Sequence, residues 1–433
     1  MLAQRVINCF NPFRNAGTLF SRPKKNGEFE DVGFLDGLRF LGHFAVVLLH
    51  VNTNCLPIVP GWKEYRAAHS IDPIVSIYFF GFIGVHVMLL ISGFLAATEL
   101  LRRIRLAPNS SITAPSSYAA FIASRLFRLW PVVWTSYLFS VLTSPRPVPF
   151  FAFISDSLFV SNYVNLKDSS NMLIWSCCVV VITLLRKMRP QLRLKLFLAL
   201  CVISSGVELF QHSLDESTYD LLNGSLIPKS SEPIELLLTG ESIDRYIIQS
   251  LPFLKIYCAT HNRFTAFLAG MLLAVDRSEK RQPNGQGWVG LALCISCFAF
   301  FVSHGERKFL MLLAAGTGHS LIAFGMYFSL FPLFTSIKSF PTIAKFLGLK
   351  LFCVASRLML SMYLFHMTVM YIIITVGYDQ GYSLQPSRVA ILGIACVTCL
   401  LSAVVAFVIY LAIEKPFLNL RDLLLETKKI SSD

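Results

Sequence analysis

Long apolar segments alternate with short polar ones along nearly the whole chain. A helix needs about 20 apolar residues to cross the hydrocarbon core of a bilayer. The pattern therefore predicts about ten transmembrane helices, near residues 35–55, 73–98, 125–144, 172–185, 194–210, 251–275, 286–303, 309–335, 351–377 and 388–413. The fourth segment is short, and the apolar segment 147–164 would add or shift a crossing. The expected fold class is all-α, a polytopic membrane helix bundle.

The composition supports lipid rather than water as the main solvent. Of the 433 residues, 55% are apolar and only 15% are charged, whereas soluble domains average about 25% charged residues. The eleven cysteines lie mostly inside apolar segments, where cysteine behaves as a small apolar residue. They therefore indicate neither a disulfide framework nor a metal site.

The net charge of +13 is explained by positively charged cytoplasmic segments rather than by nucleic-acid binding. Lysine and arginine concentrate at every second connection, which is typical of the cytoplasmic side of membrane proteins. Both termini are then cytoplasmic. This predicts a cytoplasmic tail at 1–34, a transmembrane domain at 35–414 with an outer loop at 211–250, and a cytoplasmic tail at 415–433. The outer loop carries a glycosylation sequon at Asn223, whereas the sequon at Asn109 lies on the inner side and should stay unmodified.

The first predicted helix carries a cation and an imidazole on one face. Arg39 and His50 are eleven residues apart, which is close to three helical turns and about 16 Å. His43 lies about 40° around the helix from Arg39. A structural alternative is that Arg39 extends to the interface while His50 bonds a backbone carbonyl. For these two residues alone the structural alternative is favoured, although a charge at membrane depth is costly and usually faces a cavity or a partner.

Two further segments repeat this combination. Arg125 and Arg128 lie at i,i+3 where the third helix leaves the cytoplasm, and paired guanidinium groups suit phosphate. The ninth helix carries Arg357, Ser361 and His366. Three such clusters favour a binding or catalytic site within the bundle.

Six motifs occur in an order that resembles a known family. They are Leu35-Asp-Gly-Leu-Arg39, His50 eleven residues later, Ser92-Gly93-Phe94-Leu95, Arg125-x-x-Arg128-x-x-Pro131, Tyr363-Leu-Phe-His366 and Glu414-Lys415-Pro416-Phe417. Together they resemble the acyltransferase-3 family of membrane proteins, and most closely its animal branch called nose-resistant-to-fluoxetine.

The resemblance implies transfer of an acyl group from cytoplasmic acyl-CoA to a hydroxyl-bearing or lipid acceptor at or beyond the outer face. It gives His50 the role of general base, and it assigns donor binding to Arg39, Arg125 and Arg128. Glu414 is interpreted as a structural ion-pair or cap residue. The residues expected to line the cavity are His86, Arg263, Arg357, Ser361 and His366. The expected partners are the bilayer, acyl-CoA and the acceptor, without a metal, in the plasma membrane or the endoplasmic reticulum.

Three departures from the family pattern support an alternative function. His86 stands where the family commonly has an aspartate six residues before the Ser-Gly pair. The segment around Trp175 lacks the branch's Trp-Tyr-Leu…Asp pattern, and Ala259-Thr260 replaces a Lys-Pro pair. The alternative is a catalytically inactive family member that acts as a lipid or small-molecule transporter or binding protein.

Overall fold

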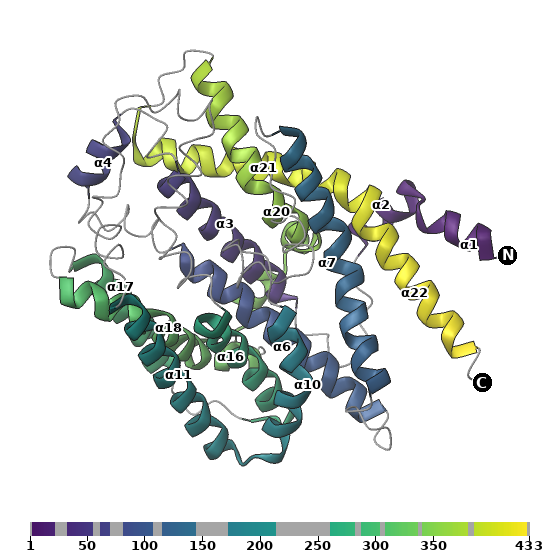
Figure 1. Ribbon diagram of the computed structural model, residues 1–433, viewed down its shortest axis with the longest axis horizontal. Helices are drawn as coiled ribbons and strands as arrows, with labels where there is room; N and C mark the ends of the chain where they lie inside the picture. Colours follow the sequence, from purple (N-terminus) through teal and green to yellow (C-terminus); the bar gives the residue numbers. More distant parts are fainter. Residues whose placement is uncertain are drawn as a thin grey trace.

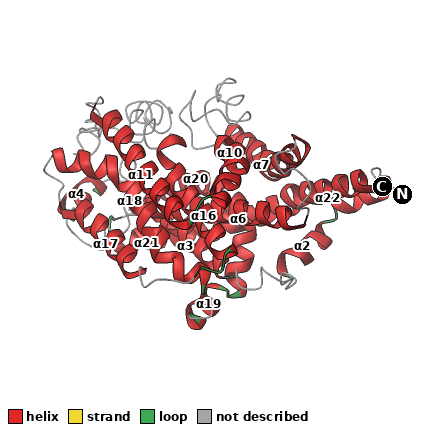
Figure 2. Cartoon of the chain, turned by 90° about the horizontal axis from the view of Figure 1, so that it is seen from below, coloured by secondary structure: helices red, strands yellow, loops and turns green. Residues whose placement is uncertain are grey.

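The structure is a computed structural model that describes residues 2–21, 33–54, 61–69, 81–106, 115–143, 172–213, 260–281, 287–303, 308–336, 340–379 and 385–430. Within these ranges every regular element is a helix (Figure 2). The all-α prediction is confirmed for this part of the chain.

The helices have the following bounds, with labels as in Figure 1. They are α1 (Leu2–Cys9), α2 (Pro12–Phe20), α3 (Phe34–Asn54), α4 (Trp62–Ala68), α6 (Phe82–Leu106), α7 (Pro115–Thr143), α10 (Met172–Lys187), α11 (Pro190–Ser213), α16 (Thr260–Ser278), α17 (Gly287–Ser303), α18 (Lys308–Thr335), α19 (Pro341–Leu347), α20 (Lys350–Asp379), α21 (Arg388–Ile409), the π-helix η3 (Tyr410–Glu414) and α22 (Lys415–Ile430).

A helix lies at each of the ten positions where the apolar pattern predicts one. Five of the described helical segments are long and apolar enough to cross a membrane: Phe34–Asn52, Ile83–Arg105, Thr317–Thr335, Lys350–Gly377 and Arg388–Leu424. The third predicted helix begins ten residues earlier than expected, at Pro115. The alternative crossing at 147–164 lies outside the described residues.

Helices α3 and α6 pack against each other in the middle of the bundle. On the side of α6 lie α16, α18, α11 and α17, and on the side of α3 lie α20 and α21 (Figure 1). Helix α7 contacts α20 and α22. The two termini lie at the same end of the molecule in both views (Figures 1 and 2).

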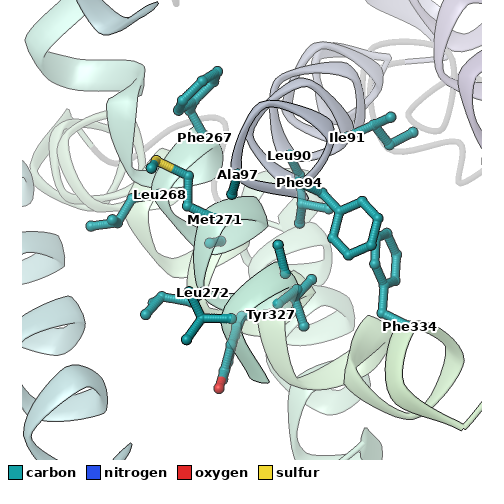
Figure 3. Close-up of a cluster of buried hydrophobic side chains, with 14 of the residues drawn as sticks. Leu90, Ile91, Phe94, Ala97, Phe267, Leu268, Met271, Leu272, Tyr327 and Phe334 are labelled. Atoms are coloured by element: carbon teal, nitrogen blue, oxygen red, sulfur yellow. The ribbon is translucent and has the colours of Figure 1, made fainter. Parts of the chain in front are cut away.

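The contact between α6 and α16 depends on glycine. A Cβ atom added to Gly93 would lie 2.0 Å from the carbonyl oxygen of Phe267, and one added to Gly270 would lie 1.9 Å from that of Leu90. Small residues allow such close approach, which is how helices associate where lipid removes the hydrophobic driving force. Around this contact Phe94, Met271 and neighbouring apolar side chains form the main buried cluster (Figure 3).

A buried ionic network holds one end of α11, α16 and α18 together. Arg193 is only 3% exposed and contacts both Glu279 and Asp276, the second at 3.8 Å. The hydroxyl of Tyr327 points away from the apolar cluster in Figure 3 and donates to Asp276 at 2.6 Å. Burial disfavours the charge of Arg281, but its hydrogen bond to Asp276 and the negative charges of Asp276 and Glu279 together outweigh this and raise the pKa of the guanidinium.

The amino-terminal segment, predicted as a polar tail, forms two helices that bind the end of the bundle. Asn15 is fully buried and donates to the carbonyl of Cys9, while Asn419 of α22 donates to the side-chain oxygen of Asn15 at 2.9 Å. Arg357 of α20 donates to the carbonyls of Thr18 and Leu19 at the end of α2. The two termini are therefore joined to each other and to α20.

The glycine contact gives a direct test of the packing of α6 on α16. Substitution Gly93→Ala should lower the free energy of unfolding by about 1–3 kcal/mol, because the added methyl group meets backbone atoms that cannot move away. The measurement is thermal unfolding in detergent. Gly206→Ala in α11 is the matched control, since a Cβ there meets nothing within 4 Å and alanine favours the helix by about 1 kcal/mol. Equal thermal stabilities for the two variants would contradict the contact.

Candidate functional site

Helices α3 and α20 pack side by side and run in the same direction. Near their amino-terminal ends Arg39 donates to the hydroxyl of Ser356 at 3.1 Å, and further along His50 lies beside His366. His50 follows Arg39 along α3, and His366 follows Ser356 along α20 by nearly the same distance. The two helices are therefore parallel. Arg39 also approaches Asp36, one turn earlier on α3, at 3.9 Å. The predicted cation and imidazole of the first helix thus both meet residues of the ninth.

Three histidines gather between these helices, and we call His43, His50 and His366 the histidine cluster. The ring centroid of His366 lies 5.3 Å from that of His43 and 5.2 Å from that of His50. His43 and His50 are seven residues apart, so they occupy one face of α3 two turns apart. His366 therefore contacts both rings from the facing helix.

The backbone fixes the tautomer of His366. Its Nδ1 lies 2.6 Å from the carbonyl oxygen of Tyr363. A carbonyl can only accept, so Nδ1 carries the proton and Nε2 of the neutral ring carries a lone pair. Nε2 is buried and has no hydrogen-bond partner within the described parts of the chain. His366 can therefore accept a proton or a hydrogen bond at that atom.

The predicted donor-binding residues also come together. Arg125 and Arg128 belong to α7, whereas Arg39 belongs to α3. The positive charges of the first two repel that of the Arg39 guanidinium. Arg125 lies over the ring of Phe121, 5.3 Å from its centroid. We call Arg39, Arg125 and Arg128 the arginine cluster. It concentrates positive charge beside the part of α3 where that helix begins.

Glu414, like Asp36, is an acidic partner of this cluster, and the predicted ion-pair role matches its contacts. Its Oε1 lies 3.8 Å from Nε of Arg128, and its Oε2 accepts a hydrogen bond from Ser361 at 3.1 Å. The carboxylate is only 1% exposed. It ends the π-helical turn η3, and such turns occur frequently at functional sites.

His86 belongs to a second polar group, on the other side of α6. Its Nε2 lies 3.1 Å from Nδ1 of His319, and the two rings are stacked with centroids 4.9 Å apart. His319 in turn lies 3.6 Å from the carboxylate of Glu208, which is fully buried. These contacts join α6, α18 and α11. They connect His86 to a different part of the bundle from the histidine cluster.

The remaining predicted site residues divide as follows. Arg357 contacts the amino-terminal helices, as described above, and Ser361 contacts Glu414. The side chain of Arg263 and all of Asn223 lie outside the described residues. His43, His319, Glu208 and Arg193 were not predicted as site residues, although helical spacing places His43 on the same broad face as Arg39 and His50.

Comparison with known proteins identifies the class and then the family. The long apolar helices of the chain make it an integral membrane protein. The acyltransferase-3 family, described as an acyltransferase domain, matches residues 32–407, and the chain therefore belongs to this family. Comparisons with curated proteins and with solved structures give no match. The family resemblance is thus confirmed, and the animal branch stays a prediction.

The second polar group predicts a specific stability effect. Substitution His319→Leu should lower the free energy of unfolding by about 1–3 kcal/mol, because it removes the hydrogen bond to His86 and the imidazole beside Glu208. Thermal unfolding of the purified protein measures this. His319→Gln is the control, since its amide keeps a donor and an acceptor, and it should retain most of the stability. A leucine variant as stable as the wild type would show that the three side chains do not depend on one another.

Proposed function

We propose that this protein transfers an acyl group from cytoplasmic acyl-CoA to a hydroxyl group of an acceptor at or beyond the outer face. The observation that carries the proposal is the arrangement of two clusters on one pair of helices. The arginine cluster lies where α3 begins, and the histidine cluster follows one to three turns further along. Membership of a family defined by an acyltransferase domain supports the same reaction.

The arginine cluster suits the phosphates of the donor. A guanidinium presents several N–H groups in a planar fork and binds phosphate oxygens in pairs. Three guanidinium groups that repel one another are stabilised by an added anion, because Asp36 and Glu414 neutralise only part of their charge. Arg39, Arg125 and Arg128 would therefore hold the nucleotide end of CoA near the cytoplasm.

His50 is the proposed general base. It takes the proton of the acceptor hydroxyl while the hydroxyl oxygen forms a bond to the thioester carbonyl carbon. The carbon–sulfur bond then breaks, CoA leaves as the thiolate, and the thiolate takes up a proton to give the free thiol. His366 lies beside His50 and carries a lone pair at Nε2, so it can orient the neighbouring ring or share its proton.

A binding or transport function without catalysis is the second candidate. It is favoured by His86, where the family commonly has an aspartate. His86 contacts His319, which in turn lies beside Glu208, so His86 belongs to a polar group separate from the histidine cluster. In that case the same clusters would bind a lipid or a small molecule and move it across the bilayer.

The proposed topology has ten crossings and cytoplasmic termini in the plasma membrane or the endoplasmic reticulum. Helices at all ten predicted positions support it, as do two termini at the same end of the molecule. The predicted outer loop 211–250 begins within the last residues of α11, and its remainder, 214–250, lies outside the described residues; its acidic composition suits an exposed segment.

Substitution of the base separates the two candidate functions. His50→Ala should reduce acyl transfer by at least about 100-fold while CoA binding persists, because general base catalysis contributes about 10²–10⁴-fold. The assay is transfer or hydrolysis of acyl-CoA by purified protein in lipid. Arg125→Gln is the companion variant and should instead weaken CoA binding. A folded wild-type protein that binds lipid but turns over none of a broad set of donors and acceptors would favour the transport candidate.

Glycosylation tests the topology. In a eukaryotic membrane Asn223 should be modified and Asn109 should not, because only sequons on the outer or luminal side meet the modifying enzyme. The measurement is the mobility shift of Asn223→Gln and Asn109→Gln variants after removal of N-glycans. Modification at Asn109 would invert the proposed orientation.

A further inference from the structure

His43 is a fully buried imidazole with two unsatisfied nitrogens. Its exposed fraction is 0%, and neither Nδ1 nor Nε2 has a hydrogen-bond partner among the residues that the structure describes. A buried polar group without a partner is energetically costly. The neighbouring His366 has a third such atom, Nε2, on a ring whose centroid is 5.3 Å away. Three adjacent unsatisfied nitrogens indicate a place that a polar group occupies in the working protein.

The position of His43 restricts the identity of the polar group that binds its ring nitrogens. On α3 it lies one turn beyond Arg39 and two turns, about 10 Å, before His50. In the proposed reaction the donor's phosphates lie at the arginine cluster and its thioester lies at His50. The part of CoA that passes between these two points is the pantetheine arm. His43 therefore lies beside the path of that arm.

The chemistry of a neutral imidazole fits this arm. One ring nitrogen donates and the other accepts, so the side chain needs a ligand that offers both. The pantetheine arm contains two secondary amides, and each has a carbonyl acceptor and an N–H donor. A phosphate offers chiefly acceptors, and an acyl chain offers neither.

We propose that His43 binds an amide of the pantetheine arm of the donor. This inference rests on the proposed acyltransferase function and assigns a binding residue that the sequence prediction did not include. His43 takes no part in bond breaking. Its role is to hold the arm in line, so that the thioester carbonyl reaches His50.

The test compares two ligands and two substitutions. Acetyl-CoA carries the pantetheine arm, whereas adenosine 3′,5′-bisphosphate carries phosphates without it. His43→Phe keeps a ring of similar size without polar atoms, and His43→Gln keeps a donor and an acceptor. Affinities are measured by calorimetry on purified protein in lipid nanodiscs, and thermal unfolding is recorded for each variant.

We expect His43→Phe to weaken acetyl-CoA binding about tenfold, the equivalent of about 1.4 kcal/mol, and to leave the bisphosphate affinity unchanged. His43→Gln should stay within about threefold of the wild type for both ligands. If His43→Phe weakens both ligands equally or neither of them, the inference is overturned, and His43 then has a structural role or binds water. Wild-type protein that binds neither ligand would overturn the proposed function itself.

Discussion

Hydrocarbon offers no hydrogen bonds, so polar groups within a membrane bundle must find partners inside the protein. This constraint explains why the polar residues of the structure occur in groups that join different helices. Arg39 with Ser356 joins α3 to α20, and Arg193 with Asp276 joins α11 to α16. The exceptions are then informative. His43 stands out because neither of its ring nitrogens has a partner among the described residues, although the same constraint requires one.

Apolar length predicted where the helices lie, but it could not predict how they pack or where all of them end. The early start of α7 at Pro115 follows from Pro-Ser-Ser-Tyr, a polar first turn that a search for apolar segments ignores. The amino-terminal helices were missed for a related reason. Their buried residues, such as Asn15, have partners about 400 positions away, and local composition records only a polar tail.

In the candidate site too, the features that depend on neighbouring residues could be predicted, whereas those that depend on residues far apart in the sequence could not. Helical spacing was sufficient to place Arg39, His43 and His50 on one broad face. Spacing could not rank His43 above other buried histidines, because its significance depends on His366 of the facing helix. The pairing of His86 with His319 spans 233 positions and could not be predicted from either segment alone. Motif order across the chain predicted the family where single residues could not.

The junction of the two termini also imposes an order on biosynthesis. Asn15 leaves the ribosome early, but Leu411 and Asn419, which contact its side chain, follow about 400 residues later. At about 5–20 residues per second this interval is about 20–80 seconds. During that time α2 lacks its docking surface, while α3 and α6 can already pair. Helices α1 and α2 are therefore made well before the surface on which they dock, and a ribosome that stops before α20 leaves them undocked.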